Sequence, residues 1–435
     1  MISGTLAILG SPNVGKSTLF NRLIGDRLAI VDDIPGLTRD RIYGKAHWLL
    51  KDFNVIDTGG IQIENVGLQT QIRAQVAIAI EEADVILFVV DGKVGISRDD
   101  LIVAKMLYKA KKPVVLAVNK IDDGQFAIDT NEFYQLGFGT PIAVSASHGI
   151  GVGDILDEVV KLLPNKAIDE YEGSISFSVI GRPNVGKSSL VNAILRQERV
   201  IVSEVEGTTR DAIDTPFRRE GRDYVVIDTA GLKKRGRIFE AVDKYAALRA
   251  LKAIDRSDVV LLVIDGSEGI REQDKHVAGY AYEARKAMII VVNKWDLVLK
   301  DQNAMHEFQK KIRDEFKFLE FAPIVFTSAK NKTRIETIFE SLIIAYEGYT
   351  LRVSTSLLND IIVDAQIMNP TPHFNGGRLK IYYANQVDVK PPTFVLFVNH
   401  PDFMHFSYKR YLENRLRDTF HFEGSPIHLI TRERK

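Results

Sequence analysis

A nine-residue loop occurs twice in this chain, and it constrains the fold more than any other feature. Each copy follows a short apolar run and precedes a segment with helical apolar periodicity. The copies read Gly10, Ser11, Pro12, Asn13, Val14, Gly15, Lys16, Ser17, Thr18 and Gly181, Arg182, Pro183, Asn184, Val185, Gly186, Lys187, Ser188, Ser189. Strand, loop and helix in this order predict a phosphate-binding loop (P-loop), whose backbone N–H groups surround an anion at a helix N-terminus. A chance glycine-rich turn is the alternative, and the recurrence argues against it.

The spacing of other motifs indicates that a whole domain is duplicated. Three pairs of matching residues are each 171 positions apart: Gly10 and Gly181, Thr38 and Thr209, Asp57 and Asp228. Unrelated coincidences would not keep this register. The separation grows to 174 between Asn119 and Asn293 and to 183 between Ser145 and Ser328. We therefore expect insertions in the later loops of the second copy, such as 299–307.

In each copy, fully apolar runs end in polar, glycine-containing loops and are separated by segments of helix length. This pattern is typical of a mostly parallel sheet with helices on both faces, in which a ligand binds beyond the carboxyl ends of the strands. We predict an α/β protein with two tandem P-loop domains and a small α+β domain. The expected boundaries are 1–164 for the first domain, 165–173 for an acidic linker, 174–349 for the second domain and 350–435 for the last.

The last 86 residues follow a different pattern, helix–strand–strand–helix–strand. We expect strands at 378–383, 393–399 and 427–430. The first helix has an apolar face made of Leu357, Leu358, Ile361, Ile362 and Ala365. The second helix has Tyr408, Leu412, Leu416 and Phe420 on one side, with Arg410 and Arg417 opposite.

The composition excludes several classes of protein. Lys plus Arg and Asp plus Glu both total 57, so no global charge demands a polyanionic partner. Cysteine is absent, which suits a reducing cytoplasm. The apolar runs are far shorter than the roughly 20 residues of a membrane-spanning helix, and the N-terminus does not resemble a secretory signal. We expect a cytoplasmic protein, monomeric in solution, without a membrane or DNA partner.

Each copy carries the residues that phosphoryl transfer requires, namely metal ligands and phosphate clamps. We expect Mg²⁺ to be held by Ser17, Thr38 and Asp57 in the first copy and by Ser188, Thr209 and Asp228 in the second. Lys16 and Lys187 are predicted to reach the β- and γ-phosphates, and Gly60 and Gly231 to offer an N–H to the γ-phosphate. We count these lysines and glycines, with the two threonines, as catalytic.

The nucleotide is also expected to contact the rest of each Asp-x-x-Gly segment: Thr58, Gly59 and Ile61, and Thr229, Ala230 and Leu232. Asp-x-x-Gly alone is often only a turn.

An Asn-Lys-x-Asp motif in each copy selects the base. The motifs are Asn119, Lys120 and Asp122, and Asn293, Lys294 and Asp296; Ser-Ala pairs follow at Ser145 and Ala146 and at Ser328 and Ala329. A carboxylate accepts hydrogen bonds from guanine N1–H and N2–H₂, whereas adenine presents an acceptor at N1 and no amino group at C2. Because mismatched polar groups discriminate strongly, we predict two sites for GTP or GDP and reject ATP. A surface turn after a strand is the weaker alternative.

With five guanine-nucleotide motifs, each copy resembles the translation-factor-like small GTPases. Two such domains before a small α+β domain resemble the Der (EngA) family of bacterial ribosome-assembly GTPases. The resemblance implies GTP hydrolysis to GDP and phosphate, Mg²⁺, association with the maturing large ribosomal subunit and its rRNA, and a KH-like C-terminal domain. A KH fold usually grips RNA with a Gly-x-x-Gly loop between two helices. Here Gly376 and Gly377 precede a strand instead, so docking against the GTPase domains or the ribosome is at least as well supported as RNA reading.

Two departures from the commonest GTPase pattern matter. The position after Asp-x-x-Gly often holds a Gln that orients water, but here Ile61 and Leu232 stand there. We predict slow intrinsic hydrolysis, with water positioned by backbone or by a partner. Asn13 and Asn184 resemble the asparagine with which potassium-activated relatives hold K⁺. Stabilisation of the loop turn is the alternative role.

The segments after the two Asp-x-x-Gly motifs differ in charge. Residues 61–82 contain one basic and three acidic side chains, a net charge of −2, whereas 233–256 contain eight basic and three acidic, a net charge of +5. The hypothesis is that Lys233, Lys234, Arg235 and Arg237 contact RNA under control of GTP. A solvated helix face is the alternative.

These features predict a GTP-hydrolysing factor for assembly of the large ribosomal subunit. The rival hypothesis is a tRNA-modification or signalling-type GTPase that acts through protein partners. The tandem domains disfavour it, because modification GTPases embed one such domain in helical surroundings. A membrane-transport GTPase is disfavoured by the lack of a spanning segment.

Overall fold

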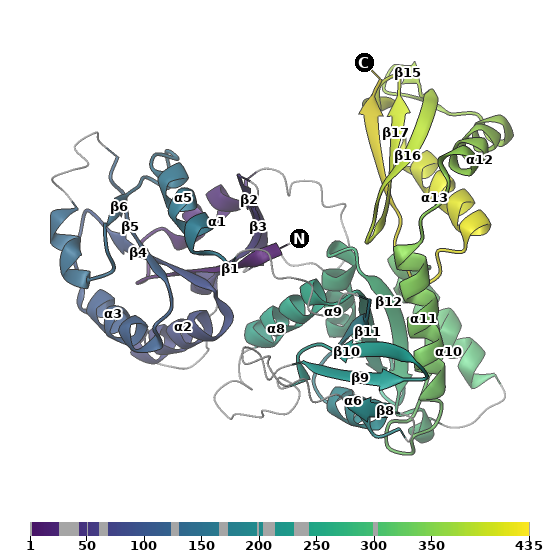
Figure 1. Ribbon diagram of the computed structural model, residues 1–435, viewed down its shortest axis with the longest axis horizontal. Helices are drawn as coiled ribbons and strands as arrows, with labels where there is room; N and C mark the ends of the chain where they lie inside the picture. The colour runs from purple at the N-terminus through teal and green to yellow at the C-terminus, as the bar shows by residue number, and fades with distance from the viewer. Residues whose placement is uncertain are drawn as a thin grey trace. The chain divides into compact units, whose positions relative to one another are not determined.

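A computed structural model describes residues 2–25, 43–49, 51–60, 68–122, 130–164, 173–197, 200–202, 214–229, 243–298 and 303–434 (Figure 1). The chain forms two compact units. One contains the first copy of the duplicated domain, and the other contains most of the second copy together with the C-terminal domain. No helix within the described ranges is long and apolar enough to cross a membrane.

The first copy is a six-stranded sheet in the order β2-β3-β1-β4-β5-β6, with β2 antiparallel to β3 and the other pairs parallel. Its strands are β1 (Ile2–Leu9), β2 (Tyr43–Trp48), β3 (Lys51–Asp57), β4 (Val85–Asp91), β5 (Val114–Asn119) and β6 (Ile142–Ala143). Its helices are α1 (Lys16–Ile24), α2 (Leu68–Glu82), α3 (Arg98–Ala110) and α5 (Val152–Leu162), with the 3-10 turns η2 (Thr58–Gly60) and η3 (Asn131–Leu136).

Alternation along β1 explains why helices cover both faces of this sheet. Leu6 and Ile8 pack into the core that contains α1 and α5, whereas Ala7 and Leu9 pack into the core that contains α2 and α3. Successive side chains of a strand point to opposite faces, so an entirely apolar strand needs cover on both. The layers are visible in Figure 1. The predicted doubly covered parallel sheet is confirmed.

The described strands of the second copy have the order β13-β12-β11-β7-β10-β9-β8, which matches the first sheet read in reverse, with β8 beside β9. The positions of the first copy that match β8 lie outside the described residues. Its strands are β7 (Ile175–Ile180), β8 (Val200–Val202), β9 (Thr215–Arg219), β10 (Arg222–Val226), β11 (Val259–Asp265), β12 (Ala287–Asn293) and β13 (Ile324–Phe326). Its helices are α6 (Lys187–Leu195), α8 (Asp243–Arg256), α9 (Glu272–Glu283), α10 (Ala304–Glu315) and α11 (Glu336–Thr350), with η4 (Trp295–Leu297) and η5 (Lys317–Leu319). The α-helix α10 lies between β12 and β13, where the described residues of the first copy contain η3, and the longer connection of the second copy accounts for the increased spacing.

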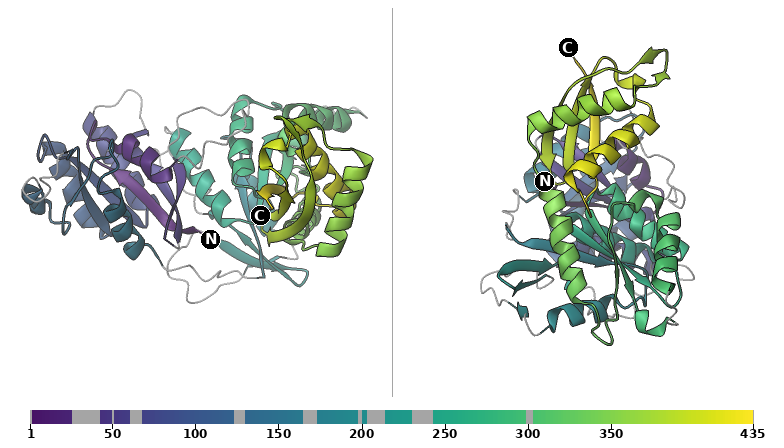
Figure 2. Two further views of the ribbon diagram at one scale, coloured as in Figure 1. Left: turned by 90° about the horizontal axis from the view of Figure 1, so that it is seen from above. Right: turned by 90° about the vertical axis from the view of Figure 1, so that its right-hand side faces the viewer.

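The C-terminal domain has a three-stranded sheet in the order β16-β17-β18. Its elements are α12 (Thr355–Met368), β14 (His373–Phe374), β15 (Gly377–Arg378), β16 (Ile381–Val389), β17 (Pro392–Val398), η6 (Pro401–Phe403), α13 (Phe406–Phe420) and β18 (His428–Glu433). Both helices pack on one face of the sheet (Figure 2). The hairpin of β14 and β15 was not predicted; Asn375 and Gly376 at its turn have φ 49° and 84°. Of the five residues expected to form the apolar face of α12, four are buried, whereas Leu357 is 47% exposed.

The C-terminal domain docks on the second copy through the loop after α13. The Gly424 N–H donates to Phe321 O at 2.7 Å, and the Met288 N–H donates to Gly424 O at 2.8 Å. Arg417 was expected to lie opposite the apolar face of its helix, but its guanidinium lies over the Phe321 ring and donates to Phe422 O. Backbone and aromatic contacts therefore join the two domains.

Candidate nucleotide-binding sites

Both P-loops connect the first strand of a sheet to a helix, α1 or α6, and have the same backbone conformation. Asn13 and Asn184 both have φ 65°, while Gly15 and Gly186 have φ 94° and 97°. The glycines leave room for neighbouring groups. A Cβ on Gly10 would lie 2.2 Å from Val89 O. The sequence therefore places glycine where the loop turns and where strand β4 approaches it.

The loop lysines lie inside their own loops. Lys16 Nζ donates to Gly10 O at 3.0 Å and to Ser11 O at 2.8 Å. Lys187 Nζ donates to Gly181 O and Arg182 O, both at 2.8 Å. Burial lowers the pKa of Lys16, against the opposing charges of Asp57 and Asp100.

In the second copy, burial lowers the pKa of Lys187 to about 8; Asp274 opposes this shift and Arg182 adds to it. Each ammonium is thus held by two carbonyls of its own loop.

Two of the predicted metal ligands meet in the first copy. The Ser17 hydroxyl donates to Asp57 Oδ2 at 2.6 Å, and Asp57 Oδ1 accepts from the Gly59 N–H at 2.9 Å. A hydroxyl and a carboxylate fit Mg²⁺, which prefers oxygen ligands and keeps several waters.

The corresponding turn of the second copy differs in conformation. Asp228 has φ 57°, and its N–H donates to Asp214 Oδ1 at 3.0 Å. Asp214 in turn pairs with Arg256. Several predicted residues lie outside the described residues: Thr38, Thr209, Ile61, Ala230, Gly231, Leu232, Lys233, Lys234, Arg235 and Arg237.

The asparagine of each Asn-Lys-x-Asp motif joins the P-loop to the Ser-Ala loop. Asn119 Nδ2 donates to Val14 O at 2.7 Å, and its Oδ1 accepts from the Ala146 N–H at 2.9 Å. Asn293 makes the same two bonds, to Val185 O at 2.9 Å and from the Ala329 N–H at 3.0 Å. Three motifs far apart in sequence therefore meet at one edge of each sheet, as predicted. Both copies have this arrangement.

Comparison with known proteins identifies the family. A family model described as "50S ribosome-binding GTPase" matches residues 5–120 and 176–294, and one described as "KH-domain-like of EngA bacterial GTPase enzymes, C-terminal" matches 352–432. The chain is 58% identical over 430 residues to the GTPase Der of Bacillus thuringiensis (strain Al Hakam) and of Bacillus cereus (strain B4264), covering 99% of each chain. The chain belongs to the GTPase Der family. The predictions of a GTP hydrolase and of a KH-like C-terminal domain are confirmed.

Solved structures of other GTPases also match. The G domain of the FeoB iron transporter of T. maritima is 27% identical, with 36% of this chain and 97% of that chain covered and a TM-score of 0.29. Era in complex with MgGDPNP and a segment of 16S ribosomal RNA is 25% identical, with 57% and 87% covered and a TM-score of 0.31.

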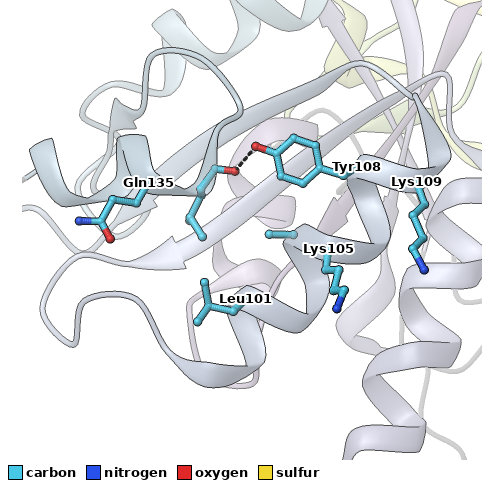
Figure 3. A pocket seen from close by; sticks show the side chains of 7 residues that line it. Leu101, Lys105, Tyr108, Lys109 and Gln135 are labelled. Carbon is cyan, nitrogen blue, oxygen red and sulfur yellow. Dashed lines mark hydrogen bonds between the residues drawn. The ribbon is translucent and has the colours of Figure 1, made fainter.

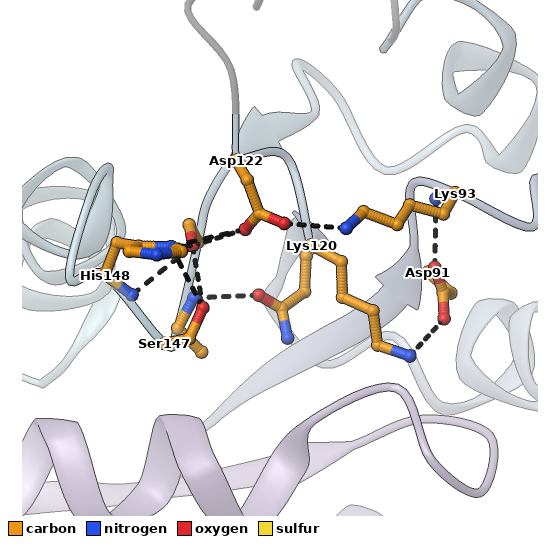
Figure 4. A network of polar contacts seen from close by, with 9 residues as sticks. Asp91, Lys93, Lys120, Asp122, Ser147 and His148 are labelled. Atoms are coloured by element: carbon orange, nitrogen blue, oxygen red, sulfur yellow. Dashed lines mark hydrogen bonds and ion pairs between the residues drawn. The ribbon is translucent and has the colours of Figure 1, made fainter.

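In this Der-family chain, Asp122, the carboxylate expected to select the base in the first copy, belongs to a polar network (Figure 4). Asp122 accepts from Lys93 at 2.6 Å and from the Ser145 hydroxyl at 2.8 Å, and these hydrogen bonds hold its pKa below its usual range. His148 lies beside Ser145. The Ser-Ala loop therefore positions Asp122 through the Ser145 hydroxyl and also donates the Ala146 N–H to Asn119 Oδ1.

Two aspartates in these sites were assigned no role from the sequence. Lys120 pairs with Asp91 at 2.6 Å and Lys294 with Asp265 at 2.7 Å. Burial alone would raise the pKa of Asp91, but the Lys120 hydrogen bond and backbone N–H groups bring it below its usual value. The pairs fix the lysines of both base motifs. The available signal was the spacing: 265 minus 91 is 174, the same as between Asn119 and Asn293.

A surface hollow on the first domain lies apart from these motifs (Figure 3). Its lining comes from α3 and η3: Leu101, Ala104, Lys105, Tyr108, Lys109, Gln135 and Leu136. The Tyr108 hydroxyl donates to Leu136 O at 2.9 Å. None of the predicted nucleotide-binding residues lines it.

Proposed function

We propose that this Der-family GTPase is a ribosome-biogenesis factor that acts in assembly of the large ribosomal subunit, with that subunit and its rRNA as partners. The observation that carries the proposal is 58% identity across 99% of the chain to curated GTPase Der proteins. The description of the matching family model, a 50S ribosome-binding GTPase, supports the large subunit. The same description disfavours the rival function, that of a tRNA-modification or signalling-type GTPase acting through protein partners. The proposed protein is a cytoplasmic monomer, and the proposed domain boundaries are 1–164, 174–349 and 350–435.

Both copies are proposed to bind GTP and GDP. The loops Gly10–Thr18 and Gly181–Ser189 would cradle the phosphates, and Asp122 and Asp296 would accept from guanine. Ser17 and Asp57, which lie in hydrogen-bond contact, support a Mg²⁺ site completed by Thr38; Ser188, Thr209 and Asp228 would form the second. Mg²⁺ would neutralise charge on the phosphate oxygens. Lys16 and Lys187 would hold the β- and γ-phosphates, and the N–H groups of Gly60 and Gly231 would orient the γ-phosphate.

The proposed hydrolysis is slow without a partner, because Ile61 and Leu232 carry no group that can hydrogen-bond water. The matched left-handed conformations of Asn13 and Asn184 support a K⁺ site in each copy. Hydrolysis should then run faster in KCl than in NaCl of equal ionic strength. Equal rates would refute the K⁺ role.

Sedimentation with ribosomal subunits tests the main proposal. We expect co-sedimentation with the large subunit in a non-hydrolysable GTP analogue and less in GDP. Sedimentation independent of nucleotide, or absent, would overturn it.

The basic segment of the second domain is proposed to contact rRNA under GTP control. Charge reversal at Lys233, Lys234 and Arg235 should weaken subunit binding and reduce its salt dependence, because fewer counterions are released. An unchanged salt slope would contradict this contact.

A further inference from the structure

In both copies, the residue after the first P-loop glycine contacts an acidic side chain near a helix N-terminus. Ser11 Oγ donates to Asp100 Oδ1 at 2.6 Å. In the second copy, Arg182 Nε lies 3.4 Å from Asp274 Oδ2, and Arg182 Nη1 pairs with Glu268 at 3.0 Å. Asp100 and Asp274 are the third residues of α3 and α9 and are 174 positions apart. The duplicated domain has therefore kept this contact with a different donor.

The same loop residue also holds the catalytic lysine. Ser11 O accepts from Lys16 Nζ at 2.8 Å, and Arg182 O accepts from Lys187 Nζ at 2.8 Å. Each of these residues is thus fixed to a helix by its side chain, while its carbonyl fixes the ammonium. If the side chain were released, the carbonyl that places the lysine would lose its support.

The carboxylates are themselves rigidly held. Asp100 is 2% exposed, and its Oδ2 accepts from the Ser97 N–H at 2.9 Å and the Ser97 hydroxyl at 2.7 Å. The Asp100 N–H donates back to the Ser97 hydroxyl at 3.1 Å, which with the Ser97 N–H bond completes a capping box that uses Oδ2 alone. Asp100 Oδ1 takes no part in the capping box and accepts from Ser11 instead, so capping of α3 does not explain the contact between Asp100 and Ser11. Asp274 is 0% exposed and accepts from the Arg271 N–H at 2.9 Å.

The contact is looser in the second copy. Among the described residues, Arg182 Nη2 and Asp274 Oδ1 are both buried without a hydrogen-bond partner. Unpaired buried polar atoms are costly. The first copy instead has a short hydroxyl–carboxylate bond.

We propose that Asp100 and Asp274 are positioning residues for GTP hydrolysis. Through Ser11 or Arg182, each holds the carbonyl that places the P-loop lysine on the phosphates. The inference rests on the proposed GTP sites. It concerns the strength of phosphate binding, so its effect falls mainly on KM and on GDP affinity.

The test uses the full-length chain, with guanine binding at the second site weakened by a substitution. Asp296→Asn deprives the second site of the carboxylate that accepts from guanine, so GTP hydrolysis then reports the first site. In this background, Ser11→Ala should raise KM for GTP about tenfold with little change in kcat, the effect expected for loss of one hydrogen bond to a charged group. Ser11→Thr keeps the hydroxyl and should restore KM to within about twofold.

Ser97→Ala is the matched control, because it removes a partner of Asp100 and leaves the Ser11 bond. We expect it to lower the Tm while KM stays within about twofold of the parent. An unchanged KM in Ser11→Ala, or an equal rise in Ser97→Ala, would overturn the positioning role. The affinity for a fluorescent GDP analogue should fall in Ser11→Ala and not in Ser97→Ala, and this measurement needs no hydrolysis. A parent chain that binds GDP but hydrolyses no GTP would contradict only the proposed function.

Discussion

At the scale of single residues, the two P-loops differ in one charged side chain beside the loop lysine. The first copy has Ser11 and the second has Arg182, which adds a like charge near Lys187. Burial and this charge lower the pKa of Lys187 to about 8, although Asp274 opposes the shift. The Lys187 ammonium therefore keeps its charge only up to mildly alkaline pH.

We expect GTP use at the second site to decline as pH rises through about 8. The ammonium of Lys187 is charged below its pKa and neutral above it, and kcat/KM reports groups of the free enzyme. The measurement is kcat/KM between pH 6.5 and 9.5 in the Asp122→Asn background, which leaves the second site intact. Arg182→Ser removes the like charge and should move the decline to higher pH. A flat profile up to pH 9 in the parent would contradict the prediction.

The base motifs give a second residue-scale prediction. Asp296→Asn should reduce GTP affinity at the second site at least about a hundredfold, because buried guanine N–H groups lose their acceptor. Xanthosine nucleotides should gain affinity, since their C2 carbonyl accepts from the asparagine amide. Nucleotide titration of the Asp296→Asn chain measures both effects. Unchanged preference for guanine would show that Asp296 does not read the base.

Loop motifs predicted the candidate phosphate- and base-binding residues, but not the side chains that hold them in place. Lys120 and Lys294 are recognisable from a local pattern, whereas their partners Asp91 and Asp265 come from a neighbouring strand. Which strands are neighbours depends on sheet order, which local patterns do not contain. The contact between Asp100 and Ser11 was not predicted either, because the two residues are 89 positions apart in sequence.

At the scale of elements, helices and strands were predictable where apolar periodicity was strong. Strands such as β4 and β11 are buried along their whole length, so their runs stand out. The C-terminal domain shows where this signal fails. Leu357 and Leu358 are adjacent and equally apolar, yet only Leu358 is buried. Helical spacing allows either to be the edge of the apolar face, and packing against the sheet decides between them.

This pair supplies a prediction about α12. Leu358→Ala should destabilise the C-terminal domain by about 2–5 kcal/mol, because it leaves a cavity in a closed core. Leu357→Ala on the same helix should change the free energy of unfolding by less than about 0.5 kcal/mol. Denaturant unfolding of the two variants measures the difference. Similar losses in both would mean that α12 is rotated relative to the described packing.

At the scale of the whole molecule, backbone hydrogen bonds of Gly424 join the C-terminal domain to the second domain. Strand β12 begins at the junction, where the Met288 N–H donates to Gly424 O, and it ends at Asn293 of the base motif. Gly424 has φ 72°, and a Cβ there would lie 2.5 Å from the Ala345 Cβ on α11. Close approach of backbone to α11 therefore requires glycine at this position.

Gly424→Ala should weaken this docking, with Gly376→Ala as the matched control. Both glycines have positive φ, but a Cβ on Gly376 meets nothing within 4 Å. The backbone penalty of about 1 kcal/mol is common to both variants, so any additional loss in Gly424→Ala comes from the junction. We expect faster hydrogen exchange at the amides of residues 288 and 424 in Gly424→Ala alone, and a larger fall in Tm than in Gly376→Ala. Equal exchange in the two variants would show that the C-terminal domain is held on the second domain by other contacts, such as the Arg417–Phe321 packing.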